Sequence, residues 1–260
     1  MDPRRQLARD RVLVLTGAAL LAALAWAYTA YLAWAMHRMA GAGEMDMPGM
    51  LMPMKRHWSA WDGVLGFVMW SVMMVAMMVP SVSPTLLLFA KVNRARRERD
   101  DPFVPTFVFL AGYLAAWTAF SAVATALQAA LHAAAVLSPD MRWTHPVLGG
   151  AILAATGFFQ WSRLKRACLT HCRSPLDVLM KGWREGHWGA FRMGVEHGFS
   201  CLGCCWALMV LLLVLGVMNL AWVAALSAFV LIEKAARGGV WLSRASGVLL
   251  VAAGAWMALH

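Results

Sequence analysis

Long, uninterrupted runs of apolar residues most constrain how this chain folds. Most of these runs are as long as a helix that crosses the hydrocarbon core of a membrane. Hydrophobic residues make up 61 % of the 260 residues and charged residues only 14 %, a balance unlike that of soluble domains. The runs lack the alternation of strands, which argues against an outer-membrane barrel. The sequence therefore predicts an all-α, polytopic membrane helix bundle, with residues 1–260 in a single integral membrane domain.

About seven transmembrane helices can be drawn through these runs. The predicted spans are residues 12–36, 62–90, 105–137, 147–163, 195–216, 219–233 and 239–258. Pro80 and Pro84 predict a kink or a break near the end of the second span. The sixth span is short and follows the fifth closely, so six spans plus a re-entrant segment is the alternative.

The basic residues predict the orientation of the bundle. With the N-terminus inside, the inner segments hold 19 of the 23 lysines and arginines, which is a strong positive-inside bias. The net charge of +10 lies in these connections between spans, and this distribution argues against nucleic acid as a partner. We expect a multi-pass membrane protein with a cytoplasmic N-terminus and the lipid bilayer as its surroundings.

The segment "EHGFSCLGCCWALMVLLLVLG" (196–216) carries three of the five cysteines. Residues four apart lie on one face of a helix, and this spacing joins Met193, His197, Cys201, Cys205 and Met209. Cys204 borders the stripe, and glycines beside it allow another backbone to approach. Thiolate, thioether and imidazole ligands suit a soft ion, with Cu(I) first. Plain packing of small apolar side chains is the alternative.

A second group of thiols lies in "CLTHCRSP", where Cys168 and Cys172 stand four apart with His171 between them. The spacings do not match those of a zinc ribbon. We expect all five cysteines near the cytoplasmic side, where thiols stay reduced. The two groups could then assemble one metal site from two helix ends. A basic juxtamembrane loop with incidental cysteines is the alternative.

Methionines are concentrated ahead of the cysteines. An outer loop, residues 36–57, is rich in methionine and predicts Cu(I) binding outside the cytoplasm, with an apolar interfacial loop as the alternative. The second span carries two neighbouring rows of methionine, which are Met69, Met73, Met77, Met74 and Met78. Packing explains such a stripe on its own, but its place between the loop and the thiols makes a copper route an equal hypothesis.

Four motifs resemble an uncharacterised bacterial family of predicted metal-binding integral membrane proteins, sometimes labelled copper chaperones. They are "MWSVMMVAMMVPS" (69–81), "KRACLTHCRSP" (165–175), "GFSCLGCCWALM" (198–209) and "GVMNL…EK" (216–234). The resemblance covers about residues 60–235. It implies metal handling in a bacterial inner membrane, with the cysteines and the methionines of the second span as the residues concerned.

Two functions remain open from the sequence. The first is Cu(I) binding for copper transport, delivery or homeostasis, with a copper-donating or copper-accepting partner protein and no catalytic residues. The second is a membrane thiol oxidoreductase that exchanges electrons with a quinone or a partner, which explains the clustered cysteines but not the methionines. Haem ligation is a weaker third hypothesis. The chain has no phosphate loop, so it does not encode ATP-driven pumping.

Overall fold

A computed structural model gives the fold of the chain and describes residues 3–42, 59–97, 105–134, 146–217, 219–236 and 238–259. Within these ranges every regular element is an α-helix, as the sequence predicts. The helices are α1 (Pro3–Ala42), α2 (Ala60–Arg97), α3 (Thr106–Ala133), α4 (Pro146–Gln160), α5 (Arg163–Arg173), α6 (Pro175–Lys181), α7 (Gly186–Leu215), α8 (Leu220–Ala235) and α9 (Gly239–Leu259).

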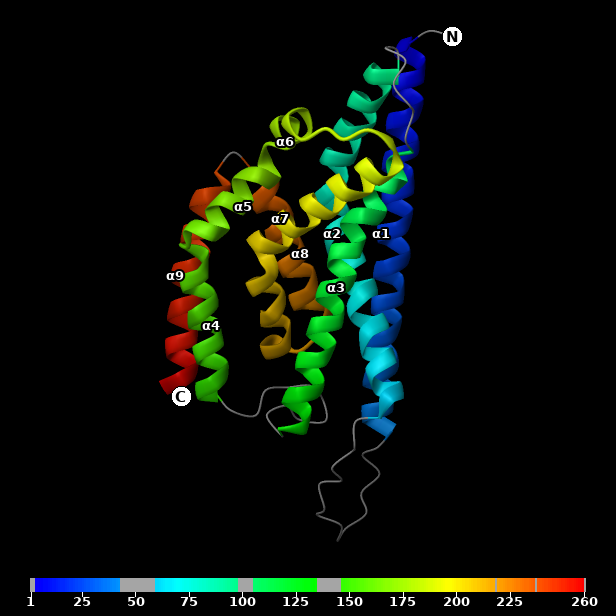
Figure 1. Cartoon of the computed structure of the whole chain (residues 1–260). Helices are drawn as coiled ribbons and strands as arrows, with labels where there is room; N and C mark the ends of the chain where they lie inside the picture. Colours follow the sequence, from blue (N-terminus) through cyan, green and yellow to red (C-terminus); the bar gives the residue numbers. More distant parts are fainter. Residues whose placement is uncertain are drawn as a thin grey trace.

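Five of the helices are long and apolar enough to cross a membrane, namely α1, α2, α3, α7 and α9. The other two helices that overlap predicted spans are shorter, with 15 residues in α4 and 16 in α8. The structure therefore supports a multi-pass helical bundle, and the count of seven spans stays a prediction. The start of α1 lies at the same end of the bundle as α5 and α6, as the predicted topology requires (Figure 1).

The helices are arranged around α7, which crosses the bundle obliquely (Figure 1). Helix α3 packs along α7, α1 along α2, and α4 along α9. In the most apolar part of α7, 61 % of residues are buried, against 17 % in α9, so α7 is central and α9 peripheral. One buried core joins α2, α3, α5 and α7.

Glycines bring α3 and α7 together. Gly194 and Gly198 are spaced as a GxxxG pair, and a methyl group on either would run into α3 at Phe109 or Tyr113. Gly112 of α3 faces the backbone of α7 in the same way. Small residues allow this close approach between membrane helices, and the predicted role of these glycines is confirmed.

The helices and the predicted membrane spans differ at three places. Helix α7 begins at Gly186 rather than near residue 195, because its first turns carry charged and polar residues that resemble a loop in sequence. Helix α1 continues to Ala42, although its candidate membrane span is Arg11–Met36, in agreement with the predicted 12–36. Helix α2 runs without a break through Pro80 and Pro84. Of the predicted methionine loop, residues 43–57 lie outside the described ranges.

Candidate metal centre

Helix α5 lies across the middle of α7 and carries two of the cysteines. Ser162 starts this helix, because its hydroxyl accepts a hydrogen bond from the Lys165 backbone N–H at 3.0 Å, as an N-cap does. The cap separates α5 from α4 and lets α5 turn onto α7. Cys168 then packs on Gly203, where a methyl group would lie 2.6 Å from the cysteine sulfur.

Two contacts hold α5 against α8. The Lys165 ammonium lies 2.8 Å from the Glu233 carboxylate, and both side chains are fully buried. The Arg173 guanidinium donates to the Ala236 carbonyl at the other end of α5. The partner of Glu233 is therefore Lys165 of another helix rather than its neighbour Lys234 in the sequence, and the pair is buried.

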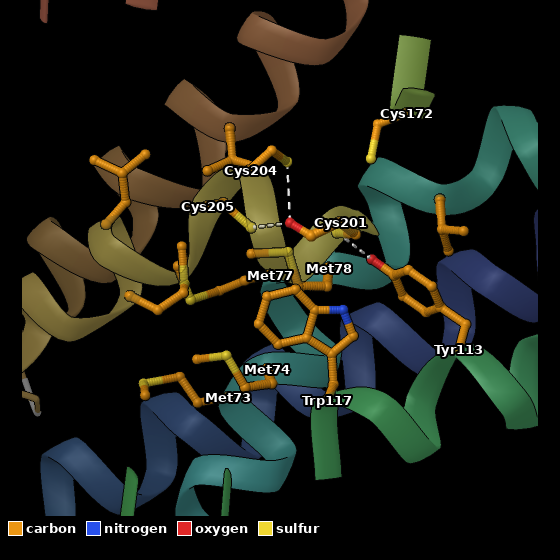
Figure 2. Close-up of a cluster of buried hydrophobic side chains, with 14 of the residues drawn as sticks. Met73, Met74, Met77, Met78, Tyr113, Trp117, Cys172, Cys201, Cys204 and Cys205 are labelled. Atoms are coloured by element: carbon orange, nitrogen blue, oxygen red, sulfur yellow. Dashed lines mark hydrogen bonds between the residues drawn. The ribbon is translucent and has the colours of Figure 1, made fainter. Parts of the chain in front are cut away.

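Four thiols meet where α5 crosses α7, and we call Cys172, Cys201, Cys204 and Cys205 the thiol cluster (Figure 2). The Cys201 thiol lies within hydrogen-bonding reach of the other three. The Cys204 and Cys205 thiols also donate to the Cys201 carbonyl, at 3.0 and 2.9 Å. All four residues are buried. The expectation that the thiols of α5 and α7 meet is therefore confirmed for Cys172, whereas Cys168 lies against Gly203; that these thiols hold a metal stays a prediction.

Cys201 is the centre of this cluster because two polar groups from other helices reach its sulfur. The Lys234 ammonium of α8 donates to it at 2.9 Å, and the Tyr113 hydroxyl of α3 lies 3.0 Å away. Lys234 also donates to the Ser81 hydroxyl of α2 at 3.2 Å. A cation at this distance balances the negative charge of a thiolate. Groups from α3, α5 and α8 thus reach the Cys201 sulfur of α7, and α2 is tied to them through the Lys234–Ser81 hydrogen bond.

The two thiols on α5 have raised pKa values. Hydrogen bonds to the Cys201 and Cys204 side chains, with burial adding to them, raise the pKa of Cys172 well above its ordinary value. Burial, with a smaller contribution from Cys204, raises the pKa of Cys168. Both side chains therefore stay protonated at neutral pH until a ligand displaces the proton.

The methionines of α2 line the other side of the thiol cluster. Met77 and Met78 lie beside the thiols, and Met73 and Met74 lie further along the same helix (Figure 2). These four and Met209 are almost fully buried, and Met69 is 7 % exposed. All six belong to the same core as the four thiols. The stripe is therefore interior packing that also supplies thioethers next to the thiols.

The two histidines lie apart from the thiol cluster, in the wall of a cavity. His171 of α5 and His197 of α7 line a space of about 600 Å³ together with Met193. Their ring centroids are 6.5 Å apart. His197 also stacks near Tyr113, at 5.9 Å between centroids. The sequence had grouped these imidazoles with the thiols, and the structure separates them.

The donor set fits a soft ion, although it is not arranged as a finished metal site. Among the described residues, no three histidine, cysteine, aspartate or glutamate side chains are already placed around one point for an ion. The reason is local, because two thiols are turned toward the Cys201 carbonyl. Thiols and thioethers are nonetheless the ligands that Cu(I) prefers, and rotation about χ1 would free both thiols.

Sequence reasoning missed Tyr113 and Ser81, and it assigned Lys234 no role at the thiols. No local pattern identifies them, since a tyrosine or a serine in an apolar span is ordinary. Lysine inside a predicted bundle is the one usable signal, because a charge there usually marks a site. The thiols also lie midway along α7, whereas the predicted span placed them at its inner end.

Comparison with known protein families gives a match over most of the chain. A family model described as "PpoB2: Copper chaperone" matches residues 67–257. The matched region contains the thiol cluster, the methionines of α2 and both cavity histidines, and it extends through most of α9. Helix α1 precedes it. No curated protein and no solved structure matches the chain.

Proposed function

Because the chain belongs to the PpoB2 copper chaperone family, we propose that it binds copper as Cu(I) within a membrane bundle. The ion is cargo, held for transport, delivery or homeostasis. The thiol cluster is the principal binding site, with thioethers of α2 and Met209 beside it. The protein lies in a bacterial inner membrane, with its N-terminus and the α5–α6 end of the bundle facing the cytoplasm.

The observation that carries this proposal is the clustering of four buried thiols around Cys201. Cys172 comes from α5 and the other three from α7. Cys172, Cys204 and Cys205 each contact the Cys201 side chain. A buried cysteine alone is a small apolar residue. Four that converge beside methionine sulfur supply the soft ligands that distinguish Cu(I) from harder ions.

The charge of the site supports a monovalent ion. Two thiolates and one Cu(I) together carry a single negative charge. The half-buried Lys234 ammonium, 2.9 Å from the Cys201 sulfur, balances it. With Zn(II) in place of Cu(I), the same groups would leave a net positive charge inside the bundle, which is costly. Lys234 therefore favours a monovalent soft ion over a divalent one.

The test is Cu(I) titration of the full chain in detergent under reductant, against a chromophoric chelator. We expect the parent to compete for Cu(I) and to gain thermal stability by mass action, by about 2.7 kcal/mol at a hundredfold excess over Kd. The double variant Cys201→Ser/Cys205→Ser should lose that gain. Ser121→Ala is the matched control, since this buried hydroxyl donates to the Trp117 carbonyl of its own helix.

Other results would redirect the proposal. Copper binding that survives in the double serine variant would place the site elsewhere. Stabilisation by Zn(II) equal to that by Cu(I) would contradict the charge argument. A parent that binds no metal but cycles between thiol and disulfide with a quinone would favour the thiol oxidoreductase.

A further inference from the structure

The cavity beside the thiol cluster holds a second set of soft-metal ligands. Five helices supply its walls: α2 and α3 contribute Thr85 and Phe109, α5 contributes His171, α6 contributes Leu179, and α7 contributes Met193 and His197. Met193 and His197 stand four apart on α7, so their side chains share a face. His171 is half-buried while His197 is 5 % exposed, so the set leads from the open side of the cavity into the protein.

The distance between the two imidazole rings leaves room for one ion between them. A metal–imidazole bond is about 2.0–2.1 Å long, and a ring nitrogen lies roughly 1.1 Å from its centroid, so two opposed ligands have centroids about 6.3 Å apart. The centroids of His171 and His197 are 6.5 Å apart. Imidazole and thioether both bind copper, and a two-imidazole pair releases the ion more readily than a set of thiolates.

The cavity lies near the thiol cluster, although none of the four thiols lines it. His197 precedes Cys201 by one helical turn, a rise of about 6 Å. The Tyr113 ring lies between the two positions, since it stacks near His197 at 5.9 Å and its hydroxyl contacts the Cys201 sulfur at 3.0 Å. An ion that leaves the imidazoles therefore has thiols as its next ligands.

We propose that His171, His197 and Met193 form a transfer site, which accepts Cu(I) from a partner and passes it to the thiol cluster. This inference rests on the proposed function and adds a step to it. The ion stays Cu(I) throughout. Its bonds to imidazole nitrogen break as bonds to sulfur form, and each thiol that becomes a ligand gives its proton to water in the cavity. The exchange proceeds inward because thiolate is the softer ligand.

A kinetic experiment separates this site from the thiol cluster. The full chain in detergent is mixed with a Cu(I)–chelator complex in a stopped-flow instrument, and the ultraviolet absorption of Cu(I)–thiolate bonds reports filling of the cluster. We expect His171→Gln to slow filling by about tenfold while the equilibrium affinity of the cluster stays within twofold of the parent. His187→Gln is the matched control, because His187 is exposed on α7 and does not line the cavity.

A second variant guards against misfolding. Met193→Leu keeps the side-chain volume and removes only the thioether, and it should slow filling while leaving the melting temperature unchanged. Filling at the parent's rate in both variants would overturn the transfer site. So would an equal loss in rate and equilibrium affinity, since the histidine would then belong to a single site. If the parent itself binds no Cu(I), the proposed function has failed instead.

Discussion

Gly203 offers the sharpest test of how α5 lies on α7. A methyl group at this position would be 2.6 Å from the Cys168 sulfur and 3.4 Å from its Cβ. Ordinary contact begins at 3.4 Å, so Gly203→Ala forces the sulfur to move by about 0.8 Å. Overpacking of this kind costs about 1–3 kcal/mol. Alanine stabilises a helix by about 1 kcal/mol relative to glycine. The net loss of stability in Gly203→Ala should therefore be about 0–2 kcal/mol.

Removing the Cys168 sulfur should reverse the sign of the stability change that Gly203→Ala causes. In a Cys168→Ala background the remaining neighbour is at the ordinary distance of 3.4 Å, so Gly203→Ala should keep its helix gain of about 1 kcal/mol. The effect of the same substitution therefore differs between the two backgrounds by about 1–3 kcal/mol. Gly17→Ala is the control, because a methyl group on Gly17 meets nothing within 4 Å and should act equally in both backgrounds.

The measurement is equilibrium unfolding of the four variants in mixed micelles, by SDS titration under reductant. A displaced α5 also carries Cys172 away from Cys201, so Gly203→Ala alone should weaken Cu(I) binding by the chelator assay. The same cost of Gly203→Ala with and without the Cys168 sulfur would refute the packing of α5 on α7 and, with it, the assembly of the thiol cluster.

Three further predictions follow from the contacts of α5 and α8. Lys165→Met leaves the buried Glu233 carboxylate unpaired and should lower the free energy of unfolding by about 3–5 kcal/mol in the same assay. Adding Glu233→Gln should restore most of the lost stability. No recovery in this double variant would contradict a buried ion pair. Lys234→Met should weaken Cu(I) binding about 10–100-fold, with Lys234→Arg closer to the parent; unchanged affinity in Lys234→Met would show that its charge is not needed. A topology reporter inserted at residues 182–185 should read as cytoplasmic, and a reading from the opposite side would contradict both the orientation and the reduced thiols.

The sequence predicted what depends on neighbours along the chain. Apolar runs identify helices because each backbone group in a membrane must bond within its own segment, and the described elements are all helical. Spacing of four residues placed His197, Cys201 and Cys205 on one buried face of α7. The motifs also identified the copper chaperone family. Local periodicity and composition were sufficient for each of these.

Helix ends were harder to predict, because hydropathy reports contact with lipid rather than helical structure. The polar first turns of α7, from Gly186 onward, are helical although their composition is that of a loop. At Ser162, by contrast, a single N-cap ends one helix and starts another, so α5 is separate from α4. This break turns both cysteines of α5 toward α7.

Only the tertiary structure decided which groups meet at the metal centre. Lys234 and Tyr113 reach the Cys201 sulfur from 33 and 88 residues away in the sequence. The angle at which α5 crosses α7 puts Cys172 among the thiols and leaves His171 in the cavity wall. Residue spacing sets which side chains share a face of one helix, but the crossing of helices sets which faces touch. That crossing depends on close contacts such as Cys168 on Gly203, which no pattern within a single helix contains.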